Sequence, residues 1–120
     1  MNTADLSGAE LDYWAARADD KNPVLGTQSG APVCLVDANP YAPSSDWRQG
    51  GPLIDRKKIM IAWNTDHWFS GVCARLRGDK ARICKGPTVL IAAMRALVQA
   101  RFGDAVADGA DPYQTDQDAH

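Results

Sequence analysis

Residues 57–85 read KKIMIAWNTDHWFSGVCARLRGDKARICK, and polar and apolar side chains alternate along most of this segment. A period of two is typical of β-strands whose two faces meet different surroundings. Turn-forming residues at 64–66 and the Gly78-Asp79 pair divide the segment into three stretches of alternation. The segment therefore predicts a three-stranded antiparallel meander.

The Gly78-Asp79 turn also predicts how the last two strands pair. A two-residue hairpin loop places Cys73 opposite Cys84, and the wide Cα separation of such a hydrogen-bonded pair disfavours a disulfide. The same register gathers four cations on one face of the hairpin: Arg75, Arg77, Lys80 and Arg82. Like charges directly opposite each other destabilise a sheet by up to about 1 kcal/mol. This basic face is therefore either a solvated surface or the contact surface of an anionic partner.

Helical patterns flank the meander on both sides. We predict a helix over residues 3–18, with Ser7 as N-cap and Glu10 completing a capping box. Its apolar stripe consists of Leu11, Trp14, Ala15 and Ala18. A glycine N-cap, a proline at the first helical position and a closing glycine predict a second helix over residues 86–103. The predicted fold class is α+β, with a small antiparallel sheet packed against N- and C-terminal helices.

The segment between the first helix and the meander lacks a clear period. Residues 21–31 are rich in Gly, Pro, Asn, Ser and Thr and predict a loop, whereas residues 32–36 predict a short strand. Within residues 47–54, Gly50-Gly51-Pro52 predicts irregular backbone that turns sharply or approaches a neighbour closely. Regular structure is expected to resume at Lys57.

The chain has 120 residues, of which 45% are hydrophobic and 23% charged, and this size suits one compact domain. We place the domain at residues 1–103 and expect residues 104–120, which hold five Asp and no Lys or Arg, to be an acidic, mobile tail. No apolar run approaches the roughly 20 residues that span a bilayer, and residues 1–10 lack the features of a signal peptide. We therefore expect a cytoplasmic protein.

The sequence offers few candidates for catalytic, cofactor-binding or metal-binding residues. Cys34, Cys73 and Cys84 form no CxxC pair and no Cys/His spacing suited to zinc, so we expect free thiols and no metal site. The sequence has no Walker loop, no GxGxxG and no HExxH motif. His67 and Asp46 are the only candidates for a general base, and no nucleophile motif accompanies either of them. Nothing in the sequence therefore points to an enzyme or to a cofactor.

Two segments have the character of binding sites. Residues 41–52 gather aromatic rings, hydroxyls, a carboxylate and two glycines in a short loop, and such loops often carry recognition. Residues 85–88, at the predicted start of the last helix, combine a lysine and a threonine hydroxyl with free backbone N–H groups, which favour anions. The alternative interpretation of the first segment is a rigid loop whose aromatic residues fill its own small core.

The amino-acid sequences of these segments are more specific than the chemistry of their side chains. The chain reads SGAELDYWA at 7–15, YAPS at 41–44, DWRQGGPLIDR at 46–56 and GPTVLIAAMR at 86–95. In these motifs it resembles the phage NinX-like family of small proteins, over about residues 3–103. The resemblance implies an origin in a temperate phage or prophage, in a region of accessory genes, and action inside the bacterial host cell. It implies no activity, because the family has no established one.

A family that keeps the loop and the helix start together suggests that the two segments meet in space. Our main hypothesis is that the loop folds over the N-terminus of the last helix and that both line one pocket for a small anionic metabolite or nucleotide. The predicted ligand-binding residues are Tyr41, Ser44, Asp46, Trp47, Gly50, Gly51, Arg56, Thr88 and Arg95. The alternative is that the loop and the helix start merely pack together and build the fold.

A second functional hypothesis is an adaptor whose basic hairpin face contacts nucleic acid or an acidic host protein. The formal net charge of −2 argues against a dedicated nucleic-acid binder, since such proteins are usually basic. A third hypothesis, an enzyme acting on a nucleotide, would need Asp46 or His67 as its base.

Overall fold

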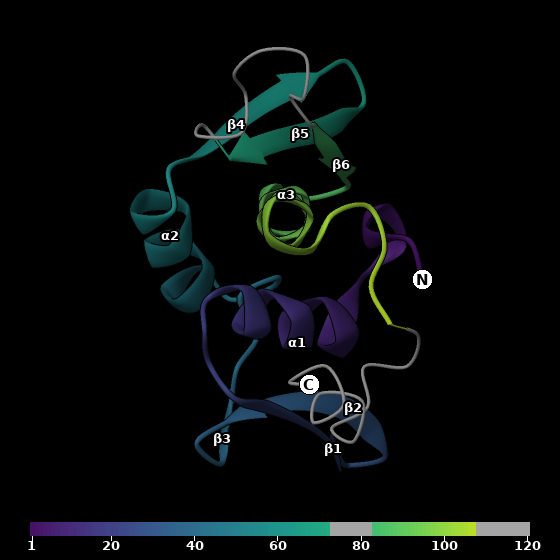
Figure 1. Ribbon diagram of the computed structural model, residues 1–120, viewed down its shortest axis with the longest axis vertical. Helices are drawn as coiled ribbons and strands as arrows, with labels where there is room; N and C mark the ends of the chain where they lie inside the picture. The colour runs from purple at the N-terminus through teal and green to yellow at the C-terminus, as the bar shows by residue number, and fades with distance from the viewer. Residues whose placement is uncertain (73–82, 108–120) are drawn as a thin grey trace.

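The computed structural model of the chain describes residues 1–72 and 83–107, and these residues form an α+β fold, as predicted (Figure 1). The helical elements are the 3-10 helix η1 (Thr3–Asp5), α1 (Gly8–Ala18), α2 (Trp47–Arg56) and α3 (Val89–Phe102). The strands are β1 (Pro23–Gln28), β2 (Ala31–Val36), β3 (Asn39–Pro40), β4 (Ile59–Asn64), β5 (His67–Val72) and β6 (Cys84–Gly86). Over the described residues the strands form two antiparallel sheets, in the orders β1-β2-β3 and β4-β5-β6.

The elements are stacked in layers (Figure 1). Helix α3 lies between the β4-β5-β6 sheet and α1, and the β1-β2-β3 sheet covers the opposite side of α1. The terminal helices therefore form the centre of the molecule. The largest fully buried side chain, Tyr13, belongs to α1, and Met94 and Val98 of α3 are also fully buried.

The prediction of a loop over residues 21–31 is wrong, because residues 23–28 form β1 and pair with β2. Ser29 and Gly30 connect the two strands with φ angles of 54° and 82°, the positive values that two-residue hairpin turns favour. The local sequence of β1 has no alternating pattern, so its pairing with β2 defines the strand. The predicted strand over 32–36 is confirmed as part of β2.

The prediction of irregular backbone at residues 47–54 is also wrong, because these residues belong to α2. Asp46 is the N-cap of this helix, and its carboxylate accepts a hydrogen bond from the backbone N–H of Arg48 at 2.9 Å. Close approach, the other part of the prediction, holds for Gly50. A Cβ atom at this position would collide with the carbonyl oxygen of Pro43 and lie 2.6 Å from Cδ2 of Leu90.

Strands β4 and β5 confirm the predicted antiparallel pairing across the turn at residues 64–66, since Trp63 pairs with Trp68. Burial does not alternate strictly along β5, because the adjacent residues Ser70 and Gly71 are both buried. The predicted pairing of Cys73 with Cys84 is wrong, because Ser70 lies opposite Cys84. This register turns the Cys84 side chain into the core instead of onto the basic face, and burial against α3 favours it. The Gly78-Asp79 turn and the basic face lie outside the described residues.

Both helix starts differ from the prediction. Ser7 precedes α1 but makes no side-chain capping hydrogen bond, so the capping box with Glu10 is not formed, and residues 3–5 form the separate helix η1. Helix α3 is capped by Thr88, whose hydroxyl accepts a hydrogen bond from the N–H of Ile91 at 3.1 Å. Gly86 lies in β6 instead, where a Cβ atom would be 2.5 Å from the backbone nitrogen of Ala92.

Other helix predictions agree with the structure. The stripe of α1 (Leu11, Trp14, Ala15 and Ala18) is buried, and α3 ends at Gly103. None of the described helices combines the length and the apolar character needed to cross a lipid bilayer.

Residues 104–106, at the start of the predicted tail, pair with the N-terminus. The N–H of Thr3 donates to the carbonyl of Asp104 at 2.8 Å, and the N–H of Val106 donates to the carbonyl of Met1 at 2.9 Å. The two ends of the described chain therefore close against each other. The tail from residue 108 onward lies outside the described residues.

Candidate functional site

Two adjoining clefts lie beside the N-terminus of α3. The Trp47 cleft has a volume of about 420 Å³ and is lined by Ser44, Ser45, Trp47, Trp68, Pro87, Thr88, Val89, Leu90 and Ile91. The Asp12 cleft has a volume of about 330 Å³ and is lined by Gly8, Ala9, Asp12, Pro32, Val33, Cys34, Tyr41, Ala42, Ser44, Ser45 and Ile91. Ser44, Ser45 and Ile91 border both clefts, so we treat the two as one groove. Four of the predicted ligand-binding residues line it: Tyr41, Ser44, Trp47 and Thr88.

The segment that forms one wall of the groove is held in place at several points. The N–H of Tyr41 donates to the carbonyl of Cys34 at 2.9 Å, and the N–H of Ser44 donates to the Asp12 carboxylate at 2.8 Å. The side chain of Gln49 accepts from the N–H of Ala42 at 2.7 Å and donates to the carbonyl of Pro40 at 3.2 Å. These bonds attach residues 40–44 to β2, α1 and α2.

Gly50 determines how α2 meets α3. Because it has no side chain, α2 packs directly on Pro43 and on the side chain of Leu90 in the first turn of α3. This contact brings Trp47, at the first position of α2, to the same cleft as Thr88 and Val89. The predicted meeting of the loop and the helix start is therefore real, although the loop is largely a helix.

Trp47 is the most exposed of the large apolar side chains described, with 57% of its surface accessible. Trp68 also lines the cleft, and Trp63, 55% exposed, packs edge-to-face on Trp68 with 5.2 Å between the ring centroids. Sequence reasoning missed Trp63 and Trp68 as surface residues. The two residues pair with each other next to the β4–β5 turn, at the end of the paired strands.

The N-terminus of α3 contributes polar groups to the Trp47 cleft. Within the described part of the chain, the N–H groups of Val89 and Leu90 have no acceptor, while the next two N–H groups bond to Thr88. The helix dipole adds about half a positive elementary charge at this end. The residues that line the cleft therefore include an exposed indole ring and the two residues whose N–H groups have no acceptor in the described chain.

Three of the predicted polar residues lie outside the groove. Arg56, at the last position of α2, donates to the Asp19 carboxylate at 2.6 Å. Arg95 donates to the backbone carbonyls of Leu6 and Lys85, each at 2.8 Å, and joins η1, β6 and α3. Asp46 caps α2. The structure therefore gives these three residues roles in holding helices and strands together.

The Asp12 cleft contains a buried carboxylate. Asp12 is 5% exposed, and burial raises its pKa, although hydrogen bonds from the hydroxyl and the N–H of Ser44 lower it in part. Burial and the charge of Asp12 raise the pKa of the Cys34 thiol to about 12. Burial, followed by the charge of Asp19, raises the pKa of Tyr41 to about 12. Both Cys34 and Tyr41 are therefore protonated at neutral pH and are poor nucleophiles.

The described residues contain no group of three His, Cys, Asp or Glu side chains that could hold a metal ion. Of the two candidate bases, Asp46 is occupied as an N-cap, and Nδ1 of His67 lies 2.7 Å from the carboxylate of its neighbour Asp66 in the β4–β5 turn. Neither of these side chains lines the groove.

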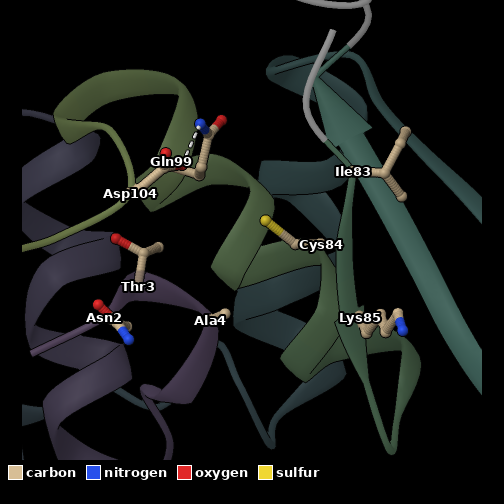
Figure 2. Close-up of a pocket in the computed structure, with 8 residues that line it drawn as sticks. All are labelled: Asn2, Thr3, Ala4, Ile83, Cys84, Lys85, Gln99 and Asp104. Carbon is tan, nitrogen blue, oxygen red and sulfur yellow. Dashed lines mark hydrogen bonds between the residues drawn. The ribbon is translucent and has the colours of Figure 1, made fainter.

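A separate cavity of about 530 Å³ lies toward the C-terminal end of α3 (Figure 2). It is lined by Asn2, Thr3, Ala4, Ile83, Cys84, Lys85, Gln99 and Asp104, none of which belongs to the predicted site. Gln99 donates to the Asp104 carboxylate at 3.0 Å, and the hydroxyl of Thr3 donates to the carbonyl of Gly103 at 2.7 Å. Burial raises the pKa of the Cys84 thiol to about 11. These groups join the chain ends, so we place the candidate site in the groove.

Among curated proteins, none matches this chain. A family model described as "Bacteriophage P22, NinX" matches residues 2–101. The matched range contains every residue that lines the groove. The match confirms the resemblance seen in the sequence motifs and supports a phage-encoded accessory protein. The chain belongs to the family of the bacteriophage P22 protein NinX.

Proposed function

We propose that this phage protein is a non-catalytic binding module that acts in the cytoplasm of the host cell. Its ligand is a small molecule with a planar ring and an anionic group, such as a nucleotide, held in the Trp47 cleft. The observation that carries the proposal is the position of Trp47. Its exposed ring lines the same cleft as the N-terminal turn of α3, where two N–H groups have no acceptor among the described residues.

The physical basis is the combination of the two features. Stacking a base on an aromatic side chain contributes about 1–3 kcal/mol, and burial of the exposed indole adds to this. Free N–H groups at a helix N-terminus favour phosphate and carboxylate oxygens. A cleft of about 420 Å³ lies within the usual range of roughly 300–1,000 Å³ for small-molecule sites. A ligand that carries both groups gains from both features at once.

Replacement of Trp47 by alanine tests the proposal. A panel of nucleoside mono- and triphosphates and cyclic dinucleotides should contain ligands that raise the melting temperature of the wild-type protein, because binding to the folded state stabilises it. Trp47→Ala is expected to weaken binding of these ligands by about tenfold or more, as expected for the loss of a stacking contact worth over 1 kcal/mol. Isothermal titration calorimetry measures the change.

Trp63→Ala is the matched control, because Trp63 is equally exposed but does not line the groove. This variant should keep the affinity of the wild-type protein. The proposal is wrong if no anionic ligand raises the melting temperature, or if Trp47→Ala binds as tightly as the wild type.

A second candidate function rests on the sequence alone. The basic hairpin face, with Arg75, Arg77, Lys80 and Arg82, lies outside the described residues, and four clustered cations favour an anionic macromolecule. If the protein is an adaptor for nucleic acid, binding to DNA or RNA should fall steeply with salt and with the double substitution Arg75→Ala/Arg82→Ala. Fluorescence anisotropy over a salt series measures this. Absence of binding at low salt would exclude nucleic acid as the partner.

A further inference from the structure

We infer that the groove selects ligands that carry hydrogen-bond donors at the end remote from their anionic group, as a guanine nucleotide does. The buried carboxylate of Asp12 lies in the cleft that adjoins the Trp47 cleft, and it accepts hydrogen bonds from these donors. This inference rests on the proposed function, because it assumes that the anionic end of the ligand lies at the N-terminus of α3.

The first observation is the state of Asp12 itself. Asp12 is a buried residue that lines the Asp12 cleft, yet it forms no ion pair within the described chain. Asp19 shows the contrast, since its similarly buried carboxylate contacts three cationic side chains: Lys21, Arg56 and Lys57. A buried carboxylate without a cation is costly to keep ionised.

The second point is that the hydrogen bonds that Asp12 makes within the fold do not require a negative charge at this position. Asp12 accepts hydrogen bonds from the N–H and the hydroxyl of Ser44, which attach residues 41–46 to α1. An asparagine would accept the same N–H without the cost of burying a charge. A carboxylate has about four acceptor positions, and Ser44 uses two of them. The remaining capacity lies in a side chain that borders a cleft.

The third observation is that the two clefts adjoin each other. Ser44, Ser45 and Ile91 border both of them, so a ligand anchored at Val89 and Leu90 passes these residues to reach Asp12. A nucleotide has its base and its phosphate at opposite ends, so this arrangement places the phosphate at the start of α3 and the base toward Asp12. The exposed ring of Trp47 lies beside this path.

Hydrogen-bond chemistry then distinguishes among the bases. Guanine presents two parallel donors, N1–H and the N2 amino group, on the edge away from the sugar, and a carboxylate accepts both in the manner of a bidentate pair. Adenine presents an acceptor at N1, which a carboxylate repels. A site built around a buried hydrogen-bonding group discriminates strongly against an analogue that leaves the group unpaired.

The experiment compares GMP, IMP and AMP by isothermal titration calorimetry on the full chain. IMP keeps the N1–H donor and lacks the N2 amino group. The wild-type protein should bind GMP at least about tenfold more tightly than AMP, with IMP between them. Asp12→Asn should reduce the preference for GMP over AMP to within about twofold, because the amide no longer offers two acceptors. The control Asp20→Asn, a charge on an exposed side chain, should keep the preference.

The outcomes separate this inference from the proposed function. Equal affinity for GMP and AMP in the wild-type protein, with binding that still depends on Trp47, overturns the inference and leaves the proposed function intact. A preference for GMP that Asp12→Asn retains also overturns it. If Asp12→Asn does not fold, the wild-type comparison of the three nucleotides still decides. If none of them and no other anionic ligand binds, the proposed function itself is wrong.

Discussion

Replacing Gly50 by alanine is expected to lower the melting temperature by more than about 10 °C, corresponding to a loss of about 3 kcal/mol of stability. The added Cβ atom would collide with the carbonyl oxygen of Pro43 and lie 2.6 Å from Cδ2 of Leu90. The carbonyl belongs to a segment tied down by hydrogen bonds and cannot move away easily. Thermal unfolding monitored by circular dichroism measures the change.

Gly51→Ala is the matched control for this prediction. Its Cβ atom would lie 3.7 Å from the Trp47 ring, an ordinary contact distance, and the position is also helical. The gain in helix propensity is about 1 kcal/mol, and the following Pro52 offsets part of it. Stability should therefore stay within about 1 kcal/mol of the wild type. Equal melting temperatures for Gly50→Ala and Gly51→Ala would contradict the packing of α2 on α3 and the groove built on it.

The second large effect is expected at Asp19, the residue that follows α1. Its carboxylate lies 2.6 Å from Nζ of Lys21, 2.6 Å from the guanidinium of Arg56 and 3.3 Å from Nζ of Lys57, and its side chain is 6% exposed. Asp19→Asn should cost about 2 kcal/mol at pH 7, because three cations lose a common partner and two of them lie at the end of α2. Urea unfolding at pH 7 measures the loss.

The effect at Asp19 should depend on pH. Burial alone would raise the pKa of this carboxyl, but hydrogen bonds from Lys21, Arg56 and Lys57 outweigh burial and hold the pKa below its ordinary value of 3.8. A carboxylate with a lowered pKa stabilises the folded state above pH 4, and this contribution is lost as the pH falls through the folded-state pKa. The difference between wild type and Asp19→Asn should therefore shrink below pH 4.

Asp20→Asn is the control, since Asp20 is 71% exposed and pairs with Arg101 on the surface. Exposed ion pairs contribute about 0–1 kcal/mol, and asparagine tolerates the positive φ of 61° at this position. A loss of stability in Asp20→Asn as large as that in Asp19→Asn would show that the Asp19 cluster has no special role. A loss in Asp19→Asn that persists at pH 2 would contradict the ionic origin of the effect.

The candidate site shows how far sequence reasoning reached. The motifs around Trp47 and Thr88 predicted that two segments forty residues apart would meet, and these residues do line one cleft. The guanidinium groups of Arg56 and Arg95 suit anions, yet both are engaged with protein groups outside the groove. Asp12 was not predicted as a site residue. Its position on the polar side of an amphipathic helix gave no sign that β2 and residues 41–45 would bury it.

Three features were determined by the sequence itself. The antiparallel pairing across the turn at residues 64–66, the apolar stripe of the first helix and the closing Gly103 each depend on residues a few positions apart. Such patterns report which face of an element is buried, whatever covers it. Family membership was likewise visible in the sequence motifs and is confirmed.

Only the tertiary structure determined the β1-β2-β3 sheet, the helical state of residues 47–56, the register of β6 and the groove. Each depends on a contact between segments far apart in the chain: β1 is a strand because β2 pairs with it, and Cys84 faces the core because α3 lies there. The role of Gly50 also depends on a contact between segments that are far apart in the chain. The sequence shows that a side chain is missing, but only the packed structure shows that Leu90 and Pro43 occupy its place.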